Sequence, residues 1–205
     1  DQAYKGIAAE TASVDSAVDE TRGTILVSAT GVVHAYYSSC DGGYTSGGDA
    51  LADPQPYLAA VPDPYCTDSP DDAWSADVPI DAFSAALRNN YGDIGTITAV
   101  APGRRDESGR LLDVAVTGSS GSIDVPATAL RALVGNHVMR STLVDSIAVG
   151  GGSVHFVGRG FGHGVGMSQW GARGMAEAGK SPDDILAFYY RGVQFAQIAD
   201  RLESR

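Results

Sequence analysis

Hydrophobic residues at helical spacing mark several short helices along this chain. Val14 and Val18 have this spacing within residues 12–21, and Gly23 follows as a stop signal. The same pattern predicts further helices at residues 80–91, 126–134, 167–178 and 182–191. The last of these has Ser181 as its N-cap and Gly192 as its stop.

Alternation of apolar and polar residues predicts strands that pair as hairpins. Hairpins are expected within residues 23–39, 95–118 and 143–160, and residues 122–126 add an edge strand. Residues 40–79 are rich in glycine, proline, aspartate and serine, so we expect a long irregular segment there. The predicted fold class is α+β, an antiparallel, hairpin-built β-sheet or barrel core with several short peripheral helices. With 205 residues the chain can form one substantial core, and we expect a single domain over residues 1–205.

The composition is that of a globular protein with many turns. Hydrophobic residues make up 43% and charged residues 19%, with 26 glycines and 9 prolines. The formal net charge of -11 repels phosphate backbones and anionic lipids, so we expect no nucleic-acid partner. Arg104, Arg105 and Arg110 form a basic cluster, which we interpret as an exposed, solvated hairpin tip. No apolar run reaches about 18 residues, so no membrane span is expected in this chain.

The two cysteines, Cys40 and Cys66, lie in turn-rich segments. A disulfide between them is the favoured interpretation, and it would close a loop of about 27 residues, worth roughly 3 to 4 kcal/mol in the loop-entropy account. Two alternatives stay open at this point: a metal half-site that includes His34, and a pair of reduced, buried thiols. On the favoured interpretation we expect no metal site and no cofactor.

The segment GRGFGHGVGMSQWGA, residues 158–172, concentrates glycines around His163. Glycine is favoured where the backbone needs a positive φ or approaches another group closely. Because the neighbours of His163 lack side chains, we expect its imidazole and the nearby amides to be accessible to a ligand. The alternative is a buried histidine held by one backbone hydrogen bond. The glycine spacing does not match a nucleotide-binding fingerprint, which argues against a phosphate cradle.

A second polar cluster, YYSSCDGGYTS at residues 36–46, offers hydroxyl groups and the Asp41 carboxylate on a glycine-containing turn. Such loops suit sugars, whose hydroxyls need donors and acceptors, although a hydrophilic surface turn has the same composition. A triad of Ser39, His163 and Asp41 can be drawn, but no G-x-S-x-G motif supports it. The remaining histidines are expected to have structural roles; they are His34, His137 and His155.

Taken together, these clusters resemble the SpoIID/LytB family of bacterial cell-wall proteins. The resemblance extends from about Gln2 to Val193, and the C-terminal motif is its most specific part. It is carried by AVDETRGTIL, AYYSSCDGGYT, PYLAAVPDPY and GRGFGHGVGMSQWGARGMAEAGKSPDDILAFYYRGV.

The resemblance implies a secreted or cell-wall-associated protein that acts on peptidoglycan outside the membrane. Sporulation members of the family are lytic transglycosylases that cleave glycan strands between N-acetylmuramic acid and N-acetylglucosamine, with a preference for strands stripped of stem peptides. LytB-type members are described as amidase enhancers, so a cell-wall amidase is a candidate partner. The candidate glycan-binding residues are Ser38, Ser39, Gly42, Gly43, Thr45, Gly162, His163, Gly164, Ser168, Gln169, Tyr189 and Tyr190.

One departure from the family pattern concerns the catalytic acid. The family's proposed catalytic glutamate belongs to an N-terminal segment that these 205 residues do not contain. Glycosidic cleavage needs a carboxylic acid to protonate the leaving oxygen. Asp41 is the best-placed acid here, and His163 is the other catalytic candidate. The glutamates are each expected to be solvated at the surface; they are Glu10, Glu20, Glu107, Glu177 and Glu203.

Three functions therefore compete. In the first, the chain is the larger part of a peptidoglycan lytic transglycosylase whose acid lies on an N-terminal piece. In the second, it is a non-catalytic glycan-binding module or an amidase enhancer. In the third, it is a metal- or triad-based hydrolase. We expect the first two, in that order, ahead of the third.

Overall fold

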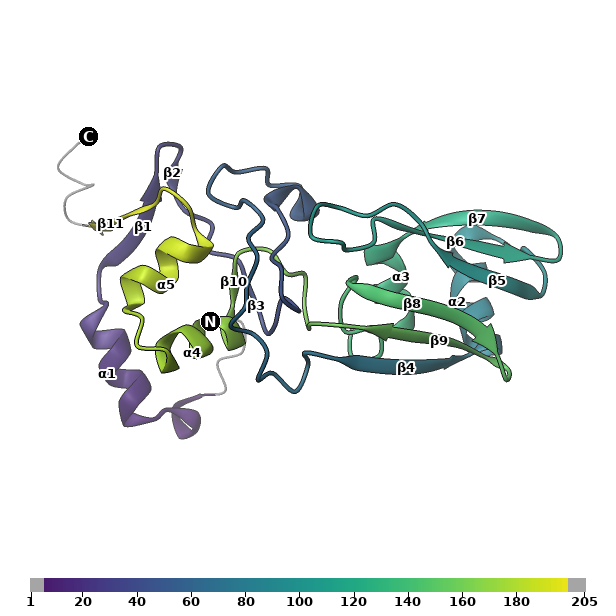
Figure 1. Ribbon diagram of the computed structural model, residues 1–205, viewed down its shortest axis with the longest axis horizontal. Coiled ribbons are helices and arrows are strands. Elements are labelled where there is room, and N and C mark those ends of the chain that lie inside the picture. Colours follow the sequence, from purple (N-terminus) through teal and green to yellow (C-terminus); the bar gives the residue numbers. More distant parts are fainter. Residues whose placement is uncertain (1–5, 199–205) are drawn as a thin grey trace. The chain divides into compact units, whose positions relative to one another are not determined.

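The computed structural model describes residues 6–198, which divide into two compact units (Figure 1). The first unit contains residues 6–34 together with residues 192–198. The second unit contains residues 35–191 and holds every candidate glycan-binding and catalytic residue named above, whereas His34 is the last residue of the first segment of the first unit.

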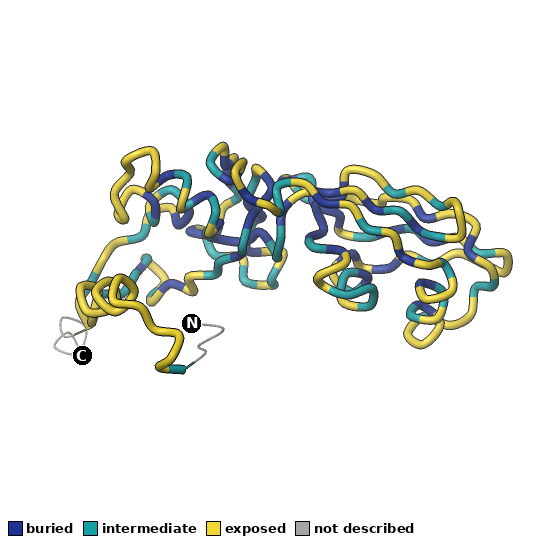
Figure 2. Tube along the Cα trace, turned by 90° about the horizontal axis from the view of Figure 1, so that it is seen from below, coloured by how far each residue is buried: buried dark blue, intermediate teal, exposed yellow. Residues whose placement is uncertain are grey.

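The first unit is a small antiparallel sheet with one helix. Its strands are β1 (Thr24–Ser28), β2 (Gly31–Val32) and β11 (Gln194–Gln197), in the order β11-β1-β2. The helix α1 (Ala12–Glu20) has no buried residue and is exposed along its length in Figure 2, and a short 3-10 turn, η1 (Ile7–Ala9), precedes it. Val27 and Val33 are the buried hydrophobic residues of this unit within its described part.

The second unit contains two three-stranded antiparallel sheets. The first has the order β4 (Trp74–Pro79), β9 (Ser153–Gly158) and β8 (Val144–Gly150). The second has the order β5 (Ile97–Pro102), β6 (Asp113–Gly118) and β7 (Gly121–Pro126). The sheets approach each other along β5 and β8, while α2 (Ile80–Tyr91) packs on β4 and β9 and α3 (Ala127–Val134) packs on β6 and β7.

The rest of the second unit is built on short elements. Strand β3 (Tyr37–Ser38) pairs in parallel with β10 (Met167–Ser168). A 3-10 turn, η2 (Gly48–Leu51), lies in the long connection after β3. Two helices follow β10 directly, namely α4 (Gln169–Glu177) and α5 (Pro182–Tyr189).

The main core lies between the two sheets and helices α2 and α3. Alternate residues of β6 point inward, as Val114 and Val116 show by being fully buried. On α2, Phe83 and Leu87 are buried at helical spacing, and the Phe83 ring lies 6.3 Å from that of Phe156 on β9. In Figure 2 the buried residues follow the strands, whereas the hairpin ends are exposed.

The α+β class is confirmed, and so are the predicted helices and hairpins. Helix α5 carries the predicted capping box between Ser181 and Asp184, with proline at its first position. The barrel alternative is wrong, because the sheets of the described residues are three-stranded or smaller and stay open. The first hairpin is shorter than expected, since its second strand is only Gly31–Val32.

The segment at residues 40–79 is less irregular than predicted, because it ends in strand β4. Trp74 and Val78 are buried there on alternate positions, with Ala76 partly buried between them. The turn residues immediately before Trp74 hide this alternation in the sequence. Among the helices of the described residues, none combines the length and apolar character needed to cross a bilayer.

Adjacent residues on β9 give a direct test of the core. Phe156 is 1% exposed and Val157 is 44% exposed, on opposite faces of the strand. We expect Phe156→Ala to lower the free energy of unfolding by about 3–5 kcal/mol, because it leaves a cavity between the sheets and α2. The matched control Val157→Ala should cost less than about 1 kcal/mol. Urea denaturation followed by circular dichroism measures both, and equal losses would contradict this placement of the core.

Candidate functional site

The glycine-rich segment packs tightly against other backbone of its own unit. Gly160, Gly162, Gly164 and Gly166 all have positive φ, between 71° and 117°. A Cβ at Gly160 would lie 2.8 Å from the Cys40 carbonyl oxygen. At each of the four positions the added atom would come within 3.0 Å of another group, which requires glycine.

The amides of this segment are largely used by the chain itself. Gly160 donates to the carbonyl of Asp71 at 2.8 Å, and Gly162 donates to that of Arg140 at 3.0 Å. Phe161 and Cys40 exchange two backbone hydrogen bonds, at 2.7 and 3.2 Å. The expectation that these amides are open to a ligand is therefore wrong, because each of them already donates to a backbone carbonyl of a neighbouring loop.

The disulfide between Cys40 and Cys66 is present, and both residues are 1% exposed. It ties residue 40, beside the glycine-rich segment, to the end of the long loop. Because both sulfurs are in this bond, neither is a thiolate ligand, and the metal half-site with His34 is not compatible with it.

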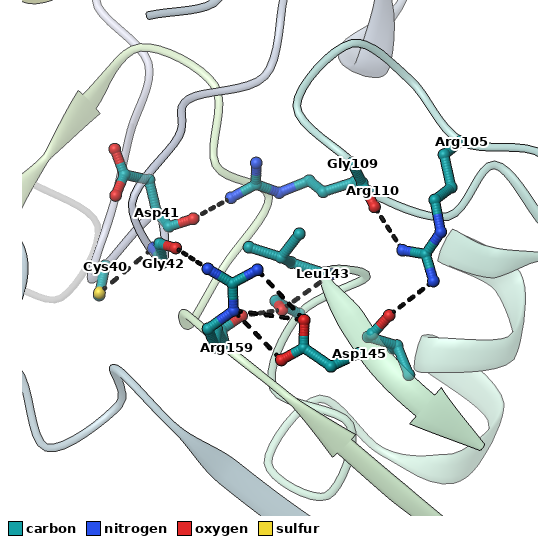
Figure 3. Close-up of polar contacts among 11 residues, drawn as sticks. Cys40, Asp41, Gly42, Arg105, Gly109, Arg110, Leu143, Asp145 and Arg159 are labelled. Carbon is teal, nitrogen blue, oxygen red and sulfur yellow. Dashed lines mark hydrogen bonds and ion pairs between the residues drawn. The ribbon is translucent and has the colours of Figure 1, made fainter. Parts of the chain in front are cut away.

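Arg110 is buried at the centre of this region, which corrects its assignment to an exposed hairpin tip. It is 2% exposed, whereas Arg104 and Arg105 are exposed as predicted. Its Nη1 donates to the Tyr44 carbonyl at 2.6 Å. Its Nη2 donates to the Asp41 carbonyl, as Figure 3 shows. Burial lowers the pKa of Arg110, and the carboxyls of Asp41 and Asp106 oppose that shift.

Arg159, at the start of the glycine-rich motif, links the same loop to strand β8. Its guanidinium pairs with the Asp145 carboxylate at 3.1 Å and donates to the Gly42 carbonyl at 3.1 Å (Figure 3). Both charged side chains are 45% exposed, so we expect this ion pair to position the loop and to add little to the free energy of unfolding.

Asp41 is completely buried beside a second acidic residue, Asp63. Its Oδ1 accepts a hydrogen bond from the Gly43 amide at 2.9 Å, while its Oδ2 has no hydrogen-bond partner within the described residues. Burial and the neighbouring charge of Asp63 raise the pKa of Asp41 to about 8. Asp63 accepts from the Tyr189 hydroxyl at 2.6 Å, and burial raises the pKa of that tyrosine. Asp41 is thus a protonated acid at neutral pH, but it has no solvent exposure.

His163 is a neutral, oriented imidazole. Its Nδ1 accepts a hydrogen bond from the Val165 amide at 3.0 Å, and its ring meets that of Tyr36 edge-on. Burial lowers its pKa, a hydrogen bond to the Tyr37 carbonyl acts in the opposite direction, and Arg110 and Arg131 lower it further. Since the ring bonds to backbone and not to Asp41, the drawn triad is not assembled.

A pocket of about 230 Å³ opens beside His163. Of the residues that line it, only Gly162 and His163 are predicted as site residues from the sequence. The polar groups that were missed come from separate parts of the chain; they are Ser46, Asp49, Asp106, Arg110, Thr128, Arg131 and Thr142. One signal existed in the sequence: Arg131 interrupts the otherwise apolar helix ATALRALV.

Several predicted glycan-binding residues are buried and bonded within the protein. Thr45 accepts from the Val61 amide at 2.8 Å, and Ser168 caps α4 through the Gly171 amide at 3.1 Å. Tyr190 donates to the Tyr36 carbonyl at 2.7 Å, and burial raises its pKa to about 12. The other buried members of the set are Ser38, Gly42, Gly164 and Tyr189.

The remaining predicted residues reach the surface or the pocket. Gly43 and Gln169 are exposed, and Ser39, Gly162 and His163 are partly buried. Their assignment to glycan binding stays a prediction, and of the set only Gly162 and His163 line the pocket.

Gly164 gives a test of the packing that forms this region. Its φ is +77°, and a Cβ there would overlap the guanidinium of buried Arg110. We expect Gly164→Ala to destabilise the protein by about 2–4 kcal/mol, from the left-handed backbone and the clash together. The control Gly151→Ala has a φ of +57° with nothing within 4 Å of its Cβ, and should cost about 1 kcal/mol. Thermal unfolding of both variants makes the comparison, and equal losses would show that Arg110 can move away.

The buried Asp41 gives a second test, based on pH. The pKa of Asp41 is raised in the folded protein. Between about pH 4 and pH 8 the folded protein therefore keeps a proton that the unfolded chain has already released. Wild-type stability should therefore fall across that range by at most about 1.4 kcal/mol per pH unit from this group. Asp41→Asn is neutral at every pH, so its free energy of unfolding should rise relative to that of the wild type as pH rises. Urea denaturation from pH 5 to pH 8 measures the difference, and a constant difference would contradict the buried proton.

The chain is similar to several known proteins over most of its length. A family described as a domain of unknown function (DUF8618) matches residues 73–166, from just before β4 to the glycine-rich segment. Stage II sporulation protein D of Bacillus amyloliquefaciens is 31% identical over 188 residues, covering 90% of this chain and 51% of the relative. The amidase enhancer of Bacillus subtilis is 28% identical over 227 residues, covering 88% of this chain and 32% of the relative.

An uncharacterized protein of Brachyspira hyodysenteriae is 31% identical over 193 residues, covering 94% of this chain and 51% of the relative. The chain thus spans about half the length of these relatives, and less of the amidase enhancer. The matches extend over both compact units and over the glycine-rich motif that carries the resemblance. The predicted resemblance to the SpoIID/LytB family is confirmed, because the similarity to stage II sporulation protein D and to the amidase enhancer extends over most of this chain.

Proposed function

We propose that this chain binds peptidoglycan glycan strands as the larger part of a SpoIID-like lytic transglycosylase, which cleaves between N-acetylmuramic acid and N-acetylglucosamine. The observation that carries the proposal is the pocket beside His163, because the motif that forms one side of it also carries the family resemblance. The similarity to stage II sporulation protein D over 90% of the chain supports the same function.

The chemistry of the pocket suits a sugar. Ser46 and Thr142 offer hydroxyls, Asp49 and Arg131 offer an acceptor and donors, and Leu111 offers an apolar surface. Sugar recognition uses this combination, since each hydroxyl needs a partner and each ring has an apolar face. His163 is held in one orientation by its backbone hydrogen bond, so it is a preorganised part of the wall.

The acid for cleavage is proposed to lie outside these 205 residues. Asp41 carries a proton at neutral pH but is fully buried, so a substrate cannot reach it without opening the loop. The four glutamates of the described residues are exposed, as predicted, and none lines the His163 pocket; Glu203 lies outside the described residues. The relatives are about twice as long as the matched region, which is consistent with an acid elsewhere in such a protein.

A second candidate function is a non-catalytic glycan-binding module or an enhancer of a cell-wall amidase. The match to the amidase enhancer of Bacillus subtilis favours it, and so does the burial of Asp41. In either case we propose an extracytoplasmic location, secreted or associated with the cell wall, which the buried Cys40–Cys66 disulfide supports.

The test incubates this chain with peptide-free glycan strands. We expect binding in a sedimentation assay and no 1,6-anhydro ends by mass spectrometry, because the accessible acid is missing. His163→Gln should weaken binding about tenfold by removing one wall of the pocket. The control His155→Gln, which breaks a surface pair with Asp77, should bind as the wild type does.

Three outcomes are informative. Absence of any glycan binding would contradict the first candidate function and would leave, of the second, only the amidase enhancer. Formation of 1,6-anhydro ends by this chain alone would place the acid within the 205 residues and overturn that part of the proposal. Binding without cleavage, together with stimulation of an added amidase, would favour the second candidate.

A further inference from the structure

The first unit leaves most of its large hydrophobic side chains in contact with solvent. Six of them are between 42% and 81% exposed, whereas the second unit, although much larger, has three exposed side chains of this kind. The six are Ile7, Val14, Val18, Val32, Phe195 and Ile198. Exposed apolar side chains that gather in one small unit mark an interaction surface.

Helix α1 shows this most clearly, because none of its nine residues is buried (Figure 2). Val14 and Val18 lie one turn apart with Ala17 beside them, and these three residues form an apolar stripe along one side of the helix, the α1 stripe. A helix of this length without tertiary packing is unstable in water, because nucleation costs more than so few hydrogen bonds return. The α1 stripe therefore needs a partner surface.

The sheet of the same unit is also incomplete. Strand β11 lies at its edge, and the residues Gln194–Gln197 carry no charge. Edge strands that face solvent are usually protected by charged residues or proline, which these four positions lack. Val27 and Val33 are the buried hydrophobic residues of the described part of this unit, and two side chains cannot offset the entropy of ordering it. Both features indicate that a further segment stabilises the unit.

The charges beside the α1 stripe define the chemistry of its partner. Helix α1 carries Asp15, Asp19 and Glu20 and has no lysine or arginine. A helix with aliphatic residues on one side and lysine or arginine next to them complements both the stripe and its acidic borders.

A second copy of this chain fits this surface less well. The acidic borders of two α1 helices would face each other, and each chain has a formal net charge of -11. An anionic lipid surface is disfavoured for the same reason.

We propose that the α1 stripe docks a basic amphipathic helix of the N-terminal piece that supplies the acid. The inference rests on the proposed function, because it names the surface through which that piece joins this chain. Two relatives, stage II sporulation protein D and the Brachyspira protein, have about half of their length outside the match, which is enough for such a helix. A piece joined ahead of residue 1 would be tethered close to α1 in sequence, so a small apolar surface suffices to hold it.

The experiment compares this chain with the longer form of the same protein that includes the N-terminal piece. Hydrogen exchange measured by mass spectrometry follows the amides of residues 12–20 in each form. In this chain alone we expect them to exchange nearly as fast as those of an unfolded peptide, because α1 has no buried residue. In the longer form we expect exchange to be at least about 100-fold slower.

Variants on opposite sides of α1 locate the docking surface. In the longer form, Val14→Gln with Val18→Gln should speed exchange of these amides at least about tenfold, because polar groups replace the stripe. The matched control is Ser13→Gln with Ser16→Gln, on the other side of the helix, and it should keep the slow exchange. Equal effects of the two double variants would show that the stripe is not the docking surface. Should the first double variant not fold, the comparison of the two wild-type forms still decides the matter.

The remaining outcomes separate this inference from the proposed function. Equal exchange in the two wild-type forms overturns the docking, and so does slow exchange that depends on the concentration of this chain alone, which assigns the surface to a second copy. A longer form that produces 1,6-anhydro ends while α1 stays unprotected refutes the docking and leaves the proposed function intact. Protection of α1 in a longer form that binds no glycan refutes the proposed function instead.

Discussion

The burial of one positive charge, that of Arg110, organises the region that holds the pocket. A guanidinium without water needs hydrogen-bond acceptors, and removing one partner from such a group costs several kcal/mol. Arg110 finds its acceptors in the backbone of the loop at residues 41–44, so the connection between β5 and β6 is joined to the loop that follows β3. Gly164 lies directly against the guanidinium, which leaves no room for any side chain at that position. The other positive-φ glycines of the motif face different neighbours: Gly160 faces Cys40, Gly162 faces Ser38 and Gly166 faces Tyr36.

Asp41 keeps its proton because it is itself buried and lies beside Asp63, although the charge of Arg110 acts in the opposite direction. Its carboxyl is buried beside that of Asp63, and two adjacent negative charges there would repel each other strongly. Protonating one of them removes the repulsion, while Asp63 retains hydrogen bonds from Tyr189 and from the Tyr65 amide. The disulfide at Cys40 holds the loop closed over this pair. A raised pKa thus arises here from packing, although the same property in an open cleft is characteristic of a catalytic acid.

Local signals in the sequence were sufficient for most of the fold. The capping box of α5, the helical spacing of Phe83 and Leu87, and the alternation in β6 each depend on a few neighbouring residues. The pocket could not be predicted in the same way, because Ser46, Asp106, Arg131 and Thr142 meet only through the tertiary fold. Arg110 shows the limit clearly: its neighbours in sequence, Arg104 and Arg105, are exposed, and only its long-range acceptors decide its burial.

The glycine-rich motif therefore has two roles in the structure, and they fall on different residues. Gly160 lies against the loop after β3, Gly164 against the Arg110 guanidinium and Gly166 against the Tyr36 backbone, so these glycines determine where His163 lies. His163 and Gly162 then form one side of the pocket, opposite polar groups that other segments supply. A substitution at a packing glycine acts on binding through displacement of the pocket wall, whereas a substitution at His163 or Arg131 removes a group that faces the pocket directly. Stability measured alongside glycan affinity distinguishes these two effects, because only the first lowers both.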